Sequence, residues 1–322
     1  MRVTNGMSSK NFSYNLHKNL TRMSKIDEKL NTGKEINRIS EDPTKASKII
    51  GLKNDIAKNA QYKKNIIDTT NYLDVTDNAL SQFSDGLQSI RELLVSAGNA
   101  TYGSDERNSI KQEVSEIINK MSDVMNTSFN GKYIFGGERT NQMPIDKSYN
   151  RATGNTVLFY RGNNGQATKE ELNQMKKNLE VEISTGVKLS YGVNSTELLE
   201  FKDKEGTNTN LMDVFTDILN NLDSEDSEDH KLLITNNLEK IDSALKNVLA
   251  TRGEVGSKQN RMEDALARNE EEKFNIKEIL SSLEDIDFAE KTIEYVTAST
   301  MYNAALQSSS KIMQPSLLDY LR

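Results

Sequence analysis

Few residues of this chain have the types and spacing that catalysis or ligand binding requires. The two histidines, His17 and His230, lie far apart in the sequence, and neither belongs to a Ser/His/Asp or metal-binding pattern. His17 is next to an apolar stripe, so we expect it to be structural. Cysteine is absent, which excludes disulfide bonds, thiol nucleophiles and cysteine metal sites.

Two other segments could in principle hold a ligand. The glycines within residues 131–137 lack the Lys-Ser/Thr pair that completes a phosphate-binding loop. The acidic run at residues 223–229 lacks the central glycine and the terminal glutamate of a calcium loop. We therefore interpret the first as turns and the second as a solvated loop before a helix. The sequence predicts no enzyme, no metal site and no cofactor.

The composition favours an elongated helical protein. Only 35% of the 322 residues are hydrophobic, 28% are charged, and there are three prolines and no tryptophan. Long helices with narrow apolar stripes need less core material than a sphere. The net charge of -7 and the lack of a basic patch argue against a nucleic-acid partner. With no apolar run near the roughly 18 residues of a membrane span and no signal-peptide core, we expect a cytosolic protein or export without cleavage.

The apolar residues follow helical periods. A first helix is expected from about residue 8 to residue 32, and Gly33 stands where a helix commonly ends. Asp42 and Pro43 favour the start of a second helix that continues to about Ala97. This helix carries a seam spaced by seven residues, as is typical of a coiled coil: Ile66, Leu73, Leu80, Leu87 and Leu94.

The middle of the chain differs in character. Ser104 favours the start of a third helix, which can fold back on the second. Asn130 and Gly131 predict a tight turn that leads into a strand. Beyond Thr140, glycines, asparagines and alternating apolar residues predict a small β-rich insertion that ends in a short helix at about residues 211–222. The expected strands are 132–135, 156–160, 181–185 and 187–191.

A long return helix is expected from about residue 228 to residue 283, and a last apolar stripe begins at Ile286. The seam of the return helix repeats every seven residues at Ile241, Val248, Val255 and Met262. Arg252 and Gln259 interrupt the second seam position, so the seam is imperfect.

The predicted fold class is mainly α: a long antiparallel coiled-coil helical rod from both termini, with a small β-rich inserted domain. Residues 1–40 plus 285–322 form a terminal coiled-coil assembly domain. Residues 41–139 plus 228–284 form a helical rod domain with a β-hairpin, and residues 140–227 form the inserted outer domain.

The terminal segments are predicted to carry the assembly function. As an isolated pair they bury little, so we expect them to order when they meet other copies. The alternative is that they pack on the same chain. The residues expected to mediate assembly are Leu16, Leu20, Met23, Leu30, Ile293, Val296, Ile312, Leu317 and Leu318.

Three short stretches of the chain resemble a known family. The stretch GKEINR at residues 33–38, followed by Asp42-Pro43, resembles the N-terminal region of bacterial flagellins and their relatives. The stretch NGKYIFGG at residues 130–137 and the ending SLLDYL at residues 316–321 are similar to the hook-associated branch, the hook–filament junction proteins. The resemblance covers both helical arms, and the insertion matches no motif.

The resemblance implies a structural subunit of the bacterial flagellum that forms a junction ring and adapts hook to filament. The implied partners are copies of itself, the first hook-associated protein, flagellin and a cytosolic flagellar export chaperone. The implied location is extracellular, after export through the flagellar type III pathway without a cleaved signal.

Two other readings stay open. A flagellin filament subunit shares the architecture, so periodicity cannot separate it from a junction subunit. A coiled-coil signalling protein would normally have a membrane span, or a long four-helix hairpin with a tight tip in place of the insertion.

Overall fold

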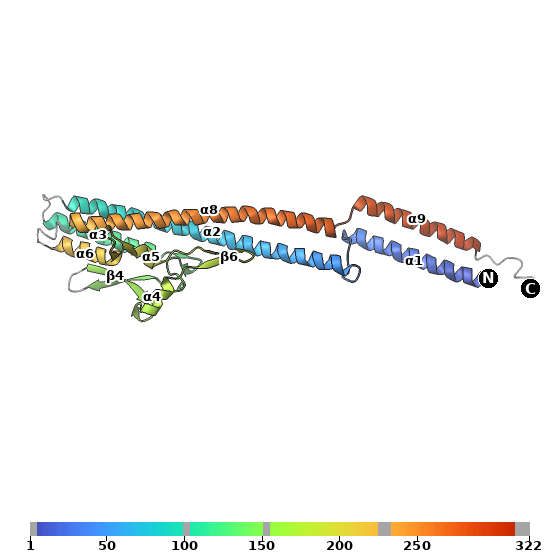
Figure 1. The fold of residues 1–322 in the computed structure, drawn as a ribbon, viewed down its shortest axis with the longest axis horizontal. Helices are drawn as coiled ribbons and strands as arrows, with labels where there is room; N and C mark the ends of the chain where they lie inside the picture. The colour runs from blue at the N-terminus through green and yellow to red at the C-terminus, as the bar shows by residue number, and fades with distance from the viewer. Residues whose placement is uncertain (1–4, 99–103, 151–154, 225–232, 313–322) are drawn as a thin grey trace, which may run out of the picture. The chain divides into compact units, whose positions relative to one another are not determined.

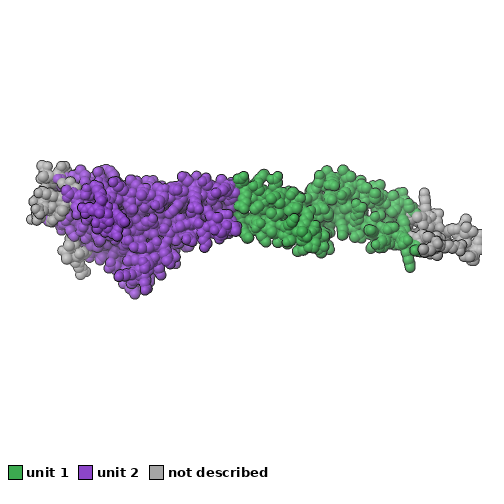
Figure 2. All heavy atoms as spheres, viewed as in Figure 1, with its two compact units in different colours: residues 1–60, 271–322 green, residues 61–270 purple. Residues whose placement is uncertain are grey.

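The computed structural model describes residues 5–98, 104–150, 155–224 and 233–312 (Figure 1). The chain forms two compact units, residues 1–60 with 271–322, and residues 61–270 (Figure 2). The helices α2 (Pro43–Ala97) and α8 (Leu238–Glu284) contribute to both units. The predicted mainly α fold with long helices near both ends and a small β-containing insertion is confirmed.

The first unit is built around two terminal helices that lie side by side, α1 (Asn5–Thr32) and α9 (Phe288–Ile312) (Figure 1). The end of α1 is as predicted. Gly33 adopts the left-handed conformation with φ +69°, and its N–H donates to the Lys29 carbonyl at 2.8 Å. Such a glycine satisfies the last carbonyls of a helix at no steric cost.

The second unit packs the remainder of α2 and α8 with two shorter helices, α3 (Ser104–Met125) and α6 (Leu211–Asp223). The core contains large, fully buried side chains from α2 and α3, such as Phe83, Leu87 and Met121. A π-helical turn, η1 (Leu233–Asn237), precedes α8. Within the described residues, the regular α-helical part of the return helix begins at Leu238. The predicted start at residue 228 lies outside the described residues.

In the part of the chain that the structure describes, four small antiparallel sheets follow the helix α3 or lie in the insertion. Their strands are β1 (Ser128–Phe129) with β2 (Lys132–Tyr133); β3 (Ile145–Asn150), β4 (Asn155–Gly162) and β5 (Gly165–Gln166); β6 (Glu180–Ser184) with β7 (Val187–Ser190); and β8 (Glu200–Lys202) with β9 (Asn208–Asn210).

The insertion is more varied than the sequence suggests. Two short helices, α4 (Lys169–Met175) and α5 (Ser195–Leu199), lie between its strands and were not predicted. The predicted strand at residues 132–135 is too long, because β2 ends at Tyr133. Ile134 and Phe135 leave the strand and enter the core, where both are at most 1% exposed.

Candidate assembly surfaces

The predicted rod seam is buried completely within the second unit. All nine residues have 0% exposure: Ile66, Leu73, Leu80, Leu87, Leu94, Ile241, Val248, Val255 and Met262. Fully burying an aliphatic side chain contributes about 1.5–3 kcal/mol, so this seam is a large source of stability. It packs inside one chain and is not available to neighbouring copies.

Polar pairs beside the seam fix the register of α2 and α8. Lys63 pairs with Glu270 at 2.7 Å, and Arg91 pairs with Asp242 at 2.7 Å. Two further links come from the residues that interrupt the predicted seam, Arg252 with Asp77 at 2.7 Å and Gln259 with Asp74 at 2.8 Å. Along these four pairs, the residue number on α8 decreases as the residue number on α2 increases, as expected for two antiparallel helices. The interruptions thus serve as cross-links between the two helices.

The predicted assembly residues of α1 face inward. Leu16, Met23 and Leu30 are half-buried, and Ile26 between them is only 6% exposed. Leu20 lies at the side of this stripe and is 39% exposed. Because α1 packs against α9, this stripe is used mainly inside the chain. The outer face of α1 is largely polar, with exposed Lys10, Lys18, Lys25 and His17.

The helix α9 is apolar on two sides. Its half-buried residues on the side of α1 are Tyr295, Ala298, Tyr302 and Ala305. Five further apolar residues of α9 are exposed, and we name them the α9 outer stripe: Ala289, Ile293, Val296, Met301 and Ala304. Ile293, Val296 and Met301 are 68%, 56% and 58% exposed.

The predicted assembly residues Ile293 and Val296 thus lie on an uncovered surface. Exposed apolar patches commonly mark interaction sites. Ile312 ends α9, and its side chain, like Leu317 and Leu318, lies outside the described residues.

The segment at residues 130–137 is a joint between the helices and the insertion. Asn130 and Gly131 have φ angles of 51° and 75°, and they form the two-residue turn that joins β1 to β2. Such left-handed pairs suit the twist of a two-stranded hairpin. The predicted turn is thus confirmed at this place.

Beyond this turn, the same segment ties α2 to the insertion. The hydroxyl of Tyr72 on α2 donates to the Ile134 carbonyl at 2.6 Å, and the Tyr72 ring packs edge-on against Tyr191 with centroids 5.0 Å apart. Burial raises the pKa of Tyr72, so the hydroxyl stays protonated and donates. The Ser195 N–H donates to the Phe135 carbonyl at 2.9 Å.

Gly137 completes the joint. It has φ +60°, and a Cβ atom there would lie 2.2 Å from the carbonyl oxygen of Met175 at the end of α4. Glycine is therefore required by both backbone conformation and space. The residues of this motif therefore determine the backbone conformation between the rod and the insertion.

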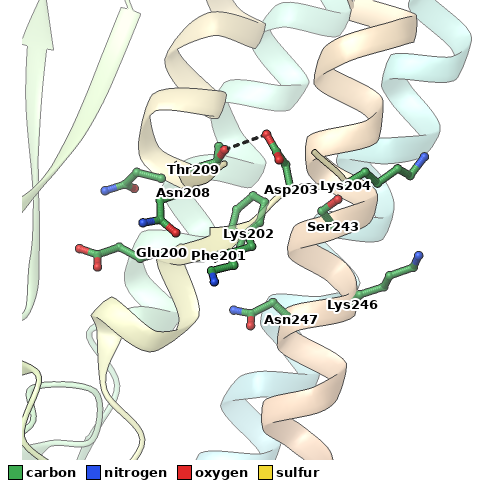
Figure 3. A pocket seen from close by; sticks show the side chains of 11 residues that line it. Glu200, Phe201, Lys202, Asp203, Lys204, Asn208, Thr209, Ser243, Lys246 and Asn247 are labelled. Atoms are coloured by element: carbon green, nitrogen blue, oxygen red, sulfur yellow. Dashed lines mark hydrogen bonds between the residues drawn. The ribbon is translucent and has the colours of Figure 1, made fainter. Parts of the chain in front are cut away.

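A groove of about 900 Å³ lies between the β8–β9 hairpin and α8 (Figure 3). Most of its polar side chains already form hydrogen bonds or ion pairs within the chain. Asp203 faces Thr209 and accepts hydrogen bonds from the N–H groups of Glu205 and Thr207. Lys204 pairs with Glu239 outside the groove at 2.8 Å. The groove is therefore an open hollow beside a well-satisfied turn.

Metal and membrane features are lacking in the part of the chain that the structure describes. Across residues 5–98, 104–150, 155–224 and 233–312, no three His, Asp or Glu side chains gather in a way that could hold a metal ion. In these ranges no helix combines the length and apolar character needed to cross a bilayer. Asp223, the first residue of the acidic run, pairs with Lys111 at 2.9 Å, while His230 and the remaining acids of the run lie outside these ranges.

Known family models match both helical arms of the chain. The model of the bacterial flagellin N-terminal helical region matches residues 3–140, and that of the C-terminal helical region matches residues 238–321. Together they span more than half of the chain. The flagellar hook-associated protein 3 of Escherichia coli (strain K12) is 26% identical over 294 residues, 89% of this chain and 88% of that protein.

Two further comparisons agree. The flagellin of Bacillus subtilis (strain 168) is 23% identical and covers 95% of this chain and 94% of its own length. The solved structure of flagellar hook associated protein-3 from Legionella pneumophila is 16% identical and has a TM-score of 0.62, over 73% of this chain and 98% of that chain. This likeness shows a shared fold. The chain belongs to the flagellin family, whose members are structural proteins of the bacterial flagellum.

Proposed function

We propose that this chain is a subunit of the junction between hook and filament, with the role of flagellar hook-associated protein 3. One observation carries the assembly part of the proposal: the α9 outer stripe is apolar and uncovered, with Ile293 68% exposed. The similarity to hook-associated protein 3 over 89% of the chain supports the junction part. Copies of the chain join through this stripe and close into a ring.

The terminal parts and the middle parts of the two helical arms have different roles. Residues 1–40 with 285–322 form the assembly domain, and residues 41–139 with 228–284 form the rod. The insertion, residues 140–227, faces outward. The buried seam makes the rod stable in a single chain, so that the terminal helices supply the contacts to neighbours.

The partners on either side are the first hook-associated protein and flagellin, and the ring adapts one to the other. The protein acts outside the cell after export through the flagellar type III pathway without cleavage. A cytosolic export chaperone covers the apolar C-terminal segment beforehand, because exposed apolar stripes favour aggregation.

A filament subunit is the second candidate, since the flagellin of Bacillus subtilis is 23% identical over 95% of the chain. Deletion of the gene in the host bacterium separates the two roles. We expect hooks without filaments, with flagellin released into the medium, as measured by electron microscopy and immunoblotting. Intact filaments, or loss of filaments with no flagellin in the medium, would overturn the junction role.

Complementation of this deletion strain tests the surface. The variant Ile293→Asn/Val296→Asn should be exported and should fail to restore filaments, because its outer stripe is polar. Leu249→Asn, on α8 and 50% exposed, is the matched control and should restore them. Full restoration by the Ile293→Asn/Val296→Asn variant would show that the stripe is not an assembly surface.

A further inference from the structure

Each of the two long helices carries a buried asparagine in its apolar seam. Asn59 stands seven residues before Ile66 on α2, and Asn269 stands seven residues after Met262 on α8. Both asparagines therefore continue the heptad positions of the rod seam. They are 3% and 5% exposed, so two amides lie inside the protein at positions where the heptad pattern calls for aliphatic side chains.

The seam changes in character at these two asparagines. On the rod side of them, all nine residues of the seam have 0% exposure. On the other side, the residues that continue the same heptad positions are Leu52, Ile276 and Leu283, and each is only half-buried. The side-chain packing on which a coiled coil depends is therefore less complete beyond each asparagine.

The division of the chain into two compact units falls at the same places. The first unit ends at residue 60 on α2 and resumes at residue 271 on α8, so each boundary directly follows the residue after an asparagine. The helices α2 and α8 both continue through these boundaries. A change in side-chain packing, with no break in either helix, therefore marks where the rod ends.

A buried amide weakens a coiled-coil seam. An asparagine at a seam position lowers stability, because its amide gives up contacts with water and supplies less apolar area than leucine or isoleucine. A folded chain opens in cooperative segments that differ in their free energy of opening. A weak layer in the seam therefore allows the segment beyond it to open while the segment before it stays closed.

We propose that Asn59 and Asn269 set the limit of the stable rod. The arms beyond them, residues 43–58 of α2 and 271–284 of α8, open and close while the rod keeps its core. The two asparagines act as positioning residues, since they decide how far the stable seam extends. This inference goes beyond the proposed function and does not depend on it, because it concerns the isolated chain alone.

Hydrogen exchange of the full-length chain, followed by mass spectrometry of its peptides, tests this inference. In the wild type, the amides of residues 45–56 should exchange at least about 100-fold faster than those of residues 73–90 in the same helix. Equal exchange in the two segments would overturn the inference. Because fraying of a helix end also speeds exchange, a substitution must show that the asparagine is the cause.

Asn59→Leu keeps the approximate size of the side chain and makes the seam apolar. It should slow the exchange of residues 45–56 at least about ten-fold, because this arm then opens together with the rod. Asn54→Leu, at an exposed asparagine of the same helix, is the matched control. It gains only the higher helix propensity of leucine and should slow exchange about two-fold. Exchange in α6, which contains neither position, should be the same in all three proteins.

Asn269→Leu repeats the test on the other helix, where it should slow the exchange of residues 272–283 by a similar factor. It decides the matter if Asn59→Leu disturbs the rod, which faster exchange in α6 would reveal. Equal slowing by Asn59→Leu and Asn54→Leu, or no slowing in the arms while α6 is unchanged, would overturn the inference. The gene-deletion test of the junction role does not bear on these results, so the two proposals can fail separately.

Discussion

The guanidinium of Arg252 on α8 makes two parallel hydrogen bonds to the carboxylate of Asp77 on α2, from Nε at 2.7 Å and from Nη2 at 3.2 Å. A lysine could make only one of them. We expect Arg252→Lys to lower the free energy of unfolding by about 0.5–1 kcal/mol, since both side chains are about one-third exposed and solvent weakens such pairs. Urea denaturation measures it. Arg261→Lys, an exposed arginine of the same helix, is the control and should have no effect.

Leu80 on α2 has 0% exposure in the rod seam. Leu80→Ala should lower the free energy of unfolding by about 2–5 kcal/mol, because it removes buried methyl groups and leaves a cavity. Leu249→Ala, at a leucine that is 50% exposed on α8, should cost less than about 1 kcal/mol. Equal losses in thermal or urea unfolding would show that the seam does not hold the rod together.

Gly137 and Gly131 both adopt positive φ angles, 60° and 75°, but their surroundings differ. A Cβ atom at Gly137 would meet the Met175 carbonyl oxygen at 2.2 Å, whereas nothing lies within 4 Å of one at Gly131. Gly131→Ala should cost about 1–2 kcal/mol from backbone strain alone. Gly137→Ala should cost clearly more and should loosen α4, as measured by urea unfolding and by hydrogen exchange of the α4 amides. Equal effects in both assays would contradict this account.

The contacts of Glu284 with Lys34 and Lys53 should weaken in acid. Burial opposes ionisation of Glu284, but hydrogen bonds from Lys34 and Lys53 outweigh it and hold the pKa of its carboxyl below the ordinary value. A lowered folded-state pKa means that Glu284 stabilises the fold above the unfolded value, about 4.3. This contribution is lost as the pH falls through the folded-state pKa.

As the pH is lowered below about 4, the free energy of unfolding measured in urea should therefore fall more in the wild type than in Glu284→Gln. Equal losses in the two proteins would show that the Glu284 carboxylate does not stabilise the fold.

The long helices could be predicted because their signal is local and repeats many times. Leu73, Leu80 and Leu87 recur at the heptad spacing, and each is fully buried. Pro43 and Gly33 mark helix ends through their own backbone preferences. Features of this kind need no knowledge of distant partners.

The polar links could not be predicted in this way. Arg252 pairs with a residue 175 positions away and Gln259 with one 185 positions away, so from the sequence both interrupt a seam. In the sequence, Glu284 cannot be distinguished from the many exposed acids, and only the fold brings Lys34 and Lys53 beside it. The strands β8 and β9 have three residues each, too few for an alternating pattern to be recognised.

The α9 outer stripe also bears on how a ring would form. An open arc of copies leaves one stripe in water at its end, while a closed ring leaves none. Burying each large apolar side chain contributes about 1.5–3 kcal/mol, so the copy that closes the ring gains two contacts where every earlier copy gained one. Closure should therefore be cooperative, with free subunits and complete rings predominating over partial arcs.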